Sequence, residues 1–206
     1  MITLDELTAF LDAYLGQSDA VARIDPHMAN GLQVRGREQV TTIITGVSAS
    51  LRFFEEAVAR GADALIVHHS LNLPKGIHFG RIFSQRLGYL LSHNLSLIGY
   101  HYLLDSHPEV GNNAQIIKSL GGRLLEPYLP DGWGWVGEFE PGVERDQLFA
   151  RCEQLFRQPG IRYPFGPPKV QRVVAISGAG APGLEEVEWL MQHRIDALIT
   201  GEAREW

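Results

Sequence analysis

The stretch that decides the fold runs from residue 41 to residue 69 and reads TTIITGVSASLRFFEEAVARGADALIVHH. Thr41 to Val47 is a continuous, β-branched segment that predicts a strand. Arg52 to Arg60 has the spacing of a helix that ends at Gly61, and Ala64 to Val67 is a second apolar strand. The order strand, helix, strand predicts a βαβ unit with parallel strands.

The same alternation continues on both sides of this unit. Gly80 to His93 predicts a helix, Leu95 to Tyr100 a strand, and Asn112 to Leu120 another helix. A helix also opens the chain, because Thr3 and Glu6 have the spacing of an N-terminal capping box. Strands that alternate with helices predict the α/β class, with mostly parallel sheets and helices on both faces.

The pattern changes after Pro127. Trp133 to Phe139 alternates between apolar and polar residues, which indicates an antiparallel or edge strand. The elements predicted beyond it are a helix at Glu144 to Phe156, a strand at Val170 to Ile176, a helix at Leu184 to His193 and a strand at Ala197 to Thr200. We therefore expect two α/β subdomains of related βαβ architecture: residues 1–126, which carry the candidate site, and residues 127–206, which stop short at their C-terminal end.

One tetrapeptide occurs twice. Asp63-Ala64-Leu65-Ile66 returns as Asp196-Ala197-Leu198-Ile199, each time after a strand, a glycine and a helix. Either the chain contains a duplication, or two βαβ units merely look alike. If it is a duplication, Gly201-Glu202 takes the place of His68-His69, and Glu202 becomes a candidate site residue.

Metal-ligating side chains follow two predicted strands. His68 and His69 follow one, and His101 and Asp105 follow the next. In open parallel sheets, ligands bind outside the carboxyl ends of the strands, so these side chains are expected to converge. Adjacent residues on a regular strand face opposite ways, so the histidine pair serves one centre only if the chain bends, or else each histidine serves its own ion. His101 and Asp105 share a face if the backbone there is extended.

Two imidazoles and a carboxylate suit zinc, iron, manganese or nickel, and a carboxylate such as Asp105 can bridge two ions. We therefore take His68, His69 and Asp105 as candidate ligands of two divalent ions. The alternatives are that the histidines only cap a strand, and that Asp105 forms a turn or cap ahead of the helix near Asn112.

The amino-acid composition excludes some classes of protein and disfavours others. Cys152 is the only cysteine, which excludes an intrachain disulfide and the cysteine-based zinc motifs. No apolar run approaches the roughly 20 residues needed to cross a bilayer, and the start of the chain lacks the basic region of a signal peptide. The formal net charge of −6 disfavours nucleic acid as a partner. We expect a cytoplasmic protein without membrane contact.

Several segments together resemble a known family, the Nif-three-like dinuclear metal-centre family, whose members are labelled GTP cyclohydrolase I type 2 homologues. The segments are Asn30 to Val34, Ile44 to Val47, Gly61 to His69, Tyr100 to Asp105, His107 to Asn113 and Ile199 to Glu202. The resemblance implies two α/β subdomains, a toroidal homohexamer, and two divalent metal ions held by His68, His69 and Asp105.

The chain also departs from that family. Its members continue past the Thr-Gly-Glu segment and supply a further histidine and glutamate from a Gly-His-His-x-x-Glu-like motif, which is absent here. Glu202 to Trp206 resembles the beginning of a helix without a C-cap, so we expect a truncated chain with a partial site.

Two functions follow from these expectations. The first is a metal-dependent hydrolase acting on an unidentified small molecule, in which His101 or Glu202 moves protons; opening of the GTP ring is implied by the resemblance alone. The second is a non-catalytic metal-binding scaffold or regulatory hexamer that binds a protein or a nucleic acid.

Overall fold

The computed structural model describes residues 1–73, 76 and 78–202, and they form two compact units, Met1–Leu104 and Asp105–Trp206. The division falls earlier than the expected one after residue 126, because helix α6 (Asn112–Ser119) packs against strands of the second unit and shares their core.

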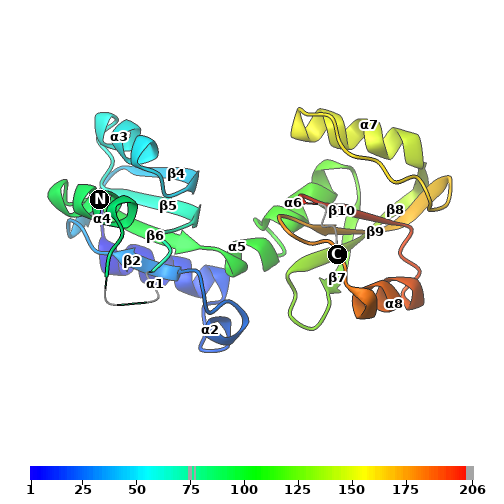
Figure 1. Cartoon of the computed structure of the whole chain (residues 1–206), viewed down its shortest axis with the longest axis horizontal. Helices are drawn as coiled ribbons and strands as arrows, with labels where there is room; N and C mark the ends of the chain where they lie inside the picture. Colours follow the sequence, from blue (N-terminus) through cyan, green and yellow to red (C-terminus); the bar gives the residue numbers. More distant parts are fainter. Residues whose placement is uncertain (74–75, 77, 203–206) are drawn as a thin grey trace. The chain divides into compact units, whose positions relative to one another are not determined.

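The first unit is built around a four-stranded sheet with the order β2-β6-β5-β4 (Figure 1). Strand β4 pairs parallel with β5, β5 parallel with β6, and β2 antiparallel with β6. The elements are β1 (Ile2–Thr3), α1 (Leu4–Leu15), α2 (Val21–Ile24), β2 (Asn30–Val34), β3 (Gln39–Val40), β4 (Ile43–Ser48), α3 (Leu51–Ala59), β5 (Ala64–His69), α4 (Arg81–Ser92) and β6 (Ser96–Tyr100).

Alternate residues of the central strands enter two different cores, as the pleat of a strand requires. Leu65 and Leu97 pack with Phe54 of α3 and with α4 on one face of the sheet. Ala64 and Ile98, one position away along each strand, pack with α1 on the other face. The predicted helices on both faces of the sheet are therefore confirmed.

The predicted start of the chain is also confirmed. Glu6 donates its backbone N–H to Thr3 Oγ1 over 3.2 Å, and the Glu6 carboxylate accepts the Thr3 N–H over 2.9 Å. This reciprocal capping box satisfies two N–H groups that lack a partner within the helix.

Helix α5 (Tyr102–Ser106) spans the boundary between the units, and the second unit continues with α6, β7 (Arg123–Tyr128), β8 (Gly134–Glu144), α7 (Arg145–Phe156), β9 (Lys169–Ile176), α8 (Leu184–Gln192) and β10 (Ala197–Thr200) (Figure 1). Its sheet has the order β10-β9-β8-β7, with one parallel pair at β10 and antiparallel pairs elsewhere. Strand β8 is antiparallel, as expected, but it lies inside the sheet rather than at its edge.

The second sheet also separates two cores. Ile117 of α6 and Leu148 of α7 pack with Val173 on one face. On the other face Val174 packs with Tyr128, whose ring meets that of Trp189 of α8 edge-on with centroids 5.2 Å apart. The second unit is thus a mixed α/β layer structure with helices on both faces.

Three elements differ from the sequence expectation. We expected Asn30-Gly31 to form a turn, but these residues begin the edge strand β2. Gly31 has a φ of +139°, and the pairing of β2 with β6 is irregular near Leu32. β7 was not expected, and Pro127 is tolerated there because β7 is an edge strand. The backbone after His101 is helical in α5 rather than extended.

The repeated tetrapeptide forms the same turn in both units. The Asp63 carboxylate accepts backbone N–H groups from Thr41 and Thr42 over 2.8 and 3.0 Å. The Asp196 carboxylate accepts those of Gln171 and Arg172 over 2.8 and 2.9 Å. In each case the aspartate directly precedes a strand, β5 or β10, that runs parallel to its neighbour, β4 or β9. This likeness favours a duplication.

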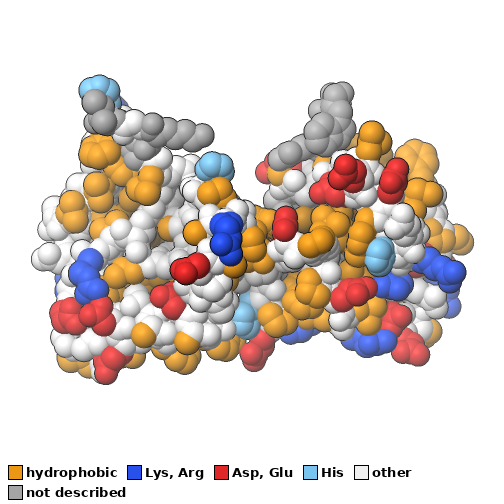
Figure 2. All heavy atoms as spheres, turned by 90° about the horizontal axis from the view of Figure 1, so that it is seen from below, with side chains coloured by type: hydrophobic (Ala, Val, Ile, Leu, Met, Phe, Trp, Pro, Cys, Tyr) orange, Lys and Arg blue, Asp and Glu red, His pale blue; other side chains and the backbone are white. Residues whose placement is uncertain are grey.

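The surface carries charges of both signs. On the face of each unit drawn in Figure 2, basic and acidic side chains lie interspersed with hydrophobic ones. Within the described residues, no helix combines the length and the apolar character needed to cross a bilayer. The helix expected from residue 202 onward falls largely on residues 203–206, outside the described residues.

Candidate metal centre

Three histidines gather at the carboxyl ends of neighbouring strands in the first unit. His68 and His69 end β5, and His101 directly follows β6. One ligating nitrogen from each of the three lies within 4.8 Å of the others. The ring centroids of His68 and His69 are 4.5 Å apart, and that of His101 lies 4.8 Å from His68 and 5.5 Å from His69.

The strand pairing places the three histidines at one end of the sheet. The β5–β6 ladder ends at the pair Val67 and Gly99, so the three histidine rings lie just beyond it. His69 still pairs with Ser48 of β4. The convergence expected at the strand ends is therefore present, and β5 keeps its strand conformation through His69.

Two of the three imidazoles are held by an oxygen on their Nδ1 side. His101 Nδ1 lies 2.8 Å from Asp25 Oδ2, and His69 Nδ1 lies 3.3 Å from Ser48 Oγ. Metal-ligating histidines usually engage their second ring nitrogen in this way, which fixes the tautomer and the ring orientation. With Nδ1 engaged, Nε2 is the nitrogen that each of these rings can offer to a metal.

Asp25 is itself held in place. It is 6% exposed, and its Oδ2 accepts the Asn30 side-chain amide over 2.9 Å. The Asn30 Oδ1 accepts the backbone N–H groups of His101 and Leu103 over 3.0 and 3.2 Å. Asn30 thus ties the backbone after β6 to the carboxylate that orients the His101 ring.

Tyr100 adds a second anchor next to His101. It is 1% exposed, and its hydroxyl donates to Asp12 Oδ1 over 2.6 Å. Burial, together with the nearby Asp12 carboxylate, raises the pKa of Tyr100 above its ordinary value. The phenol therefore remains a neutral hydrogen-bond donor to α1 rather than a proton carrier for the site.

The donor set fits a divalent transition metal. Three neutral imidazoles are ligands for zinc, copper, iron and nickel, whereas a site made of oxygens alone would suit magnesium or calcium. The three rings are half-buried or exposed, so a metal has access from solvent. The residues present thus fit such an ion by ligand type, by spacing and by the orientation of two of the rings.

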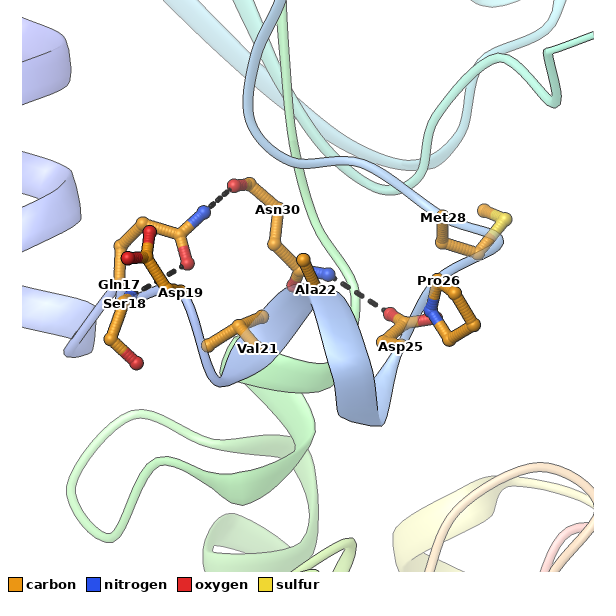
Figure 3. Close-up of a pocket in the computed structure, with 9 residues that line it drawn as sticks. All are labelled: Gln17, Ser18, Asp19, Val21, Ala22, Asp25, Pro26, Met28 and Asn30. Atoms are coloured by element: carbon orange, nitrogen blue, oxygen red, sulfur yellow. Dashed lines mark hydrogen bonds between the residues drawn. The ribbon is translucent and has the colours of Figure 1, made fainter.

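Two cavities lie close to the cluster. One has a volume of about 550 Å³ and is shown in Figure 3; Gln17, Asp19, Asp25, Met28 and Asn30 are among its lining residues. The dashed line between Asn30 and Asp25 in Figure 3 marks their side-chain hydrogen bond. This cavity therefore reaches the carboxylate that orients His101.

The second cavity, of about 350 Å³, opens beside the cluster itself. Its lining is Met28, Ser48, Ala49, Ser50, His69, Ser70, Asn72 and Arg86. Both volumes lie within the range of about 300 to 1,000 Å³ that is usual for small-molecule sites.

Asp105 lies at the beginning of the second unit and is 5% exposed. Its Oδ1 accepts the Asn112 side-chain amide and the Ser177 hydroxyl, each over 2.9 Å. Helix α6 takes Gly111 as its N-cap residue, so Asp105 is not the cap that we kept as an alternative. The carboxylate is thus held by side chains of its own unit, and it is not part of the three-histidine cluster.

Glu202 is exposed and follows β10, with its backbone N–H donating to the Gly178 carbonyl over 2.8 Å. In the first unit the bond beyond the parallel strand pair runs in the opposite direction, from the Ala49 N–H after β4 to the His69 carbonyl at the end of β5, over 2.8 Å. His101, which we expected to move protons, lies in one cluster with His68 and His69.

Sequence reasoning missed the groups that orient the cluster. Asp25 and Ser48 are remote from the histidines they contact, so spacing along the chain could not reveal them. Asn30 stood in one of the family-like segments, and its conformation as part of β2 shows why an amide is useful there.

Two curated proteins that carry the same name are similar to this chain over most of its length. A protein from Pyrococcus abyssi named "GTP cyclohydrolase 1 type 2 homolog" is 37% identical over 202 residues, which are 96% of this chain and 78% of the relative. A protein of the same name from Escherichia coli K12 is 39% identical over 188 residues, covering 89% of this chain and 73% of the relative.

Solved structures of proteins similar in sequence have the same fold as this chain. The structure described as "protein ybgI, unknown function" superimposes with a TM-score of 0.86 at 33% identity, covering 99% of this chain and 80% of the other. TTHA1606 from Thermus thermophilus gives 0.83 at 31% identity, covering 99% and 79%. The family resemblance is thereby confirmed. A family model matches residues 2–205, and the chain belongs to the Duf34/NIF3 (NGG1p interacting factor 3) family.

Proposed function

We propose that this protein is a metal-dependent hydrolase whose metal centre is formed by His68, His69 and His101. The observation that carries the proposal is the approach of one ligating nitrogen from each histidine to within 4.8 Å of the others. The engagement of two rings through Nδ1 supports it, because it prepares Nε2 for coordination.

A divalent ion bound there would supply Lewis acidity and activate water for hydrolysis. The protein's own groups have the remaining tasks. Asp25 orients the His101 ring, and Asn30 fixes the backbone on which that ring stands. The adjacent cavities provide room for a small-molecule substrate beside the histidines.

Further parts of the proposal rest on the family resemblance. They are a second metal ion, Asp105 as a ligand that bridges the two, Glu202 as a group that moves protons, and assembly into a homohexamer. The names of the relatives suggest a purine nucleotide such as GTP as substrate. The competing function is a non-catalytic metal-binding scaffold. Turnover of a substrate by the metal-loaded protein distinguishes the hydrolase from the scaffold.

Metal content tests the centre. We expect the purified chain to retain divalent metal after dialysis, and the double variant His68→Ala/His69→Ala to lose it. The matched control is His27→Ala/His78→Ala, which removes two exposed histidines outside the cluster. Elemental analysis by mass spectrometry measures the metal content of the wild type, the cluster variant and the control variant. Equal metal in the cluster variant and the wild type would refute the centre.

Turnover tests the hydrolase. The metal-loaded chain is incubated with GTP and a panel of phosphoesters, and products are separated by chromatography. We expect metal-dependent hydrolysis that His101→Ala and Asp105→Ala each reduce by about a hundredfold or more. A metal-loaded protein that hydrolyses nothing in the panel would favour the scaffold instead.

A further inference from the structure

The cavity beside His69 differs in charge from its larger neighbour. The larger cavity is lined by two carboxylates, Asp19 and Asp25. Among the described residues, the lining of the smaller one includes Arg86 and His69 but no aspartate or glutamate. Two cavities on the same unit therefore suit ligands of opposite charge, and the smaller one suits an anion.

Helix α3 begins at this cavity. Its N-cap residue Ser50 lines the cavity and accepts the Phe53 N–H through Oγ over 3.2 Å. The first residues of a helix have N–H groups without acceptors inside the helix, and the helix dipole adds positive potential at this end. Both effects favour an anion at the mouth of α3.

Ser70 gives an independent indication of a ligand. It lines the cavity and is 7% exposed, yet within the described part of the chain its Oγ has no hydrogen-bond partner. Burying a hydroxyl without a partner costs free energy. Gly99 makes room for it, because a Cβ added there would lie 2.6 Å from Ser70 Cβ. The Ser70 hydroxyl is therefore an unsatisfied polar group at the edge of the cavity.

Arg86 supplies the charge. It projects from α4, is half-buried at the cavity, and has no carboxylate partner among the residues that the structure describes. A guanidinium presents several donors in a planar arrangement that matches the oxygens of a phosphate. Hydroxyls, helix N–H groups and a guanidinium are the donors that commonly bind phosphate groups.

From these observations we propose that the cavity between α3 and Arg86 binds a phosphate group, and that this phosphate belongs to the substrate on which the adjacent metal centre acts. The link to the substrate rests on the proposed function, because His69 belongs both to the cavity and to the histidine cluster. The phosphate site itself stands on the cavity, its charge and Ser70.

The test uses the full chain stripped of metal with a chelator, so that phosphate cannot bind through an ion. Inorganic phosphate is titrated calorimetrically at constant ionic strength into the wild type, Arg86→Gln, Ser70→Ala and Arg81→Gln. Arg81 is an exposed arginine at the start of the same helix and serves as the matched control for charge.

We expect phosphate binding that weakens about tenfold in Arg86→Gln, about fivefold in Ser70→Ala, and not in Arg81→Gln. Absence of binding to the stripped wild type, equal binding by Arg86→Gln, or tighter binding of succinate than of phosphate would each overturn the proposal. The metal content of the histidine variants tests the proposed metal centre separately, so failure of the metal centre and failure of the phosphate site can be distinguished.

Discussion

At the scale of single residues, the orientation of His101 depends on a carboxylate distant in sequence. Asp25 lies after α2, and its Oδ2 is 2.8 Å from His101 Nδ1. A carboxylate behind a ligating imidazole increases its basicity and holds the ring in one orientation. Asp25 is therefore a positioning residue for the proposed centre.

The variant Asp25→Asn tests this role. It keeps the size of the side chain but removes the charge, and we expect metal affinity to fall about tenfold to a hundredfold. Competition with a chromophoric chelator measures the affinity. Asp19→Asn is the matched control, because Asp19 lines the same cavity, is exposed and undergoes the same change of charge. Equal losses in both variants would speak against a specific role for Asp25.

Cys152 gives a second prediction at this scale. It lies in α7, as expected, and burial together with Glu153 raises the pKa of its thiol to about 11. Because the thiolate is the reactive form, we expect iodoacetamide at pH 8 to modify the folded chain about tenfold or more slowly than the denatured chain. Mass spectrometry follows the single cysteine, and equal rates would contradict the prediction.

At the scale of elements, the two aspartate turns make a matched pair. Asp63 and Asp196 accept the same two kinds of backbone N–H bond, but Asp63 is buried and Asp196 is only half-buried. Removing an acceptor costs most where water cannot replace it. The same turn should therefore contribute differently to stability in the two units.

We expect Asp63→Ala to lower the free energy of unfolding by about 2–4 kcal/mol and Asp196→Ala by about 1 kcal/mol. Urea denaturation followed by circular dichroism measures both variants against the wild type. A larger effect at Asp196 would contradict the argument from burial.

The charge of Asp63 adds a dependence on pH. Burial alone would raise its pKa, but the N–H groups of Thr41 and Thr42 and the Arg37 guanidinium outweigh burial and hold the pKa below its ordinary value. A carboxyl with a lowered folded-state pKa stabilises the protein above its unfolded pKa, and this contribution is lost as the pH falls through the folded-state value.

Between about pH 5 and pH 3, wild-type stability should therefore decline more steeply than that of Asp63→Asn, which has no charge to lose at this position. Urea melts across this range compare the two slopes. Parallel slopes would show that Asp63 does not titrate differently in the folded and unfolded states.

Elements with a clear local sequence pattern could be predicted, whereas the edge strands β2 and β7 could not. The inner strands β5 and β6 are apolar on both faces, which a continuous hydrophobic segment shows directly. The edge strands β2 and β7 contain Gly31 and Pro127, whose local preferences resemble those of turns. Only pairing with a neighbouring strand makes them strands, and pairing is a long-range property.

For the candidate site, too, features with a local sequence pattern could be predicted and long-range contacts could not. The gathering of His68, His69 and His101 could be expected from strand order, because the carboxyl ends of parallel strands meet at one edge. The contacts of Asp25 and Ser48 depend on how distant segments fold back, and neither residue has a local pattern that reveals it.

At the scale of the whole molecule, each unit has hydrophobic cores of its own. Leu65 belongs to a core made only of residues from the first unit, and Val173 to one made only of residues from the second. Units with separate cores can open separately.

We expect Leu65→Ala to destabilise the first unit by about 2–5 kcal/mol, because it leaves a cavity in a fully buried core. Hydrogen exchange should accelerate in β5 and β6 and remain unchanged in β9 and β8. Val173→Ala should produce the reverse pattern. Acceleration throughout the chain in both variants would show that the units unfold as one.

Met28 lines both the cavity at Asp25 and the cavity at Arg86, so one flexible thioether forms a shared wall between an acidic and a basic compartment. A molecule long enough to pass that wall meets opposite electrostatic potentials at its two ends. A dipolar compound would then enter in one direction only, with its cationic end toward Asp25 and its anionic end toward Arg86. The length and bulk of the side chain at position 28 would set the size of compound that fits.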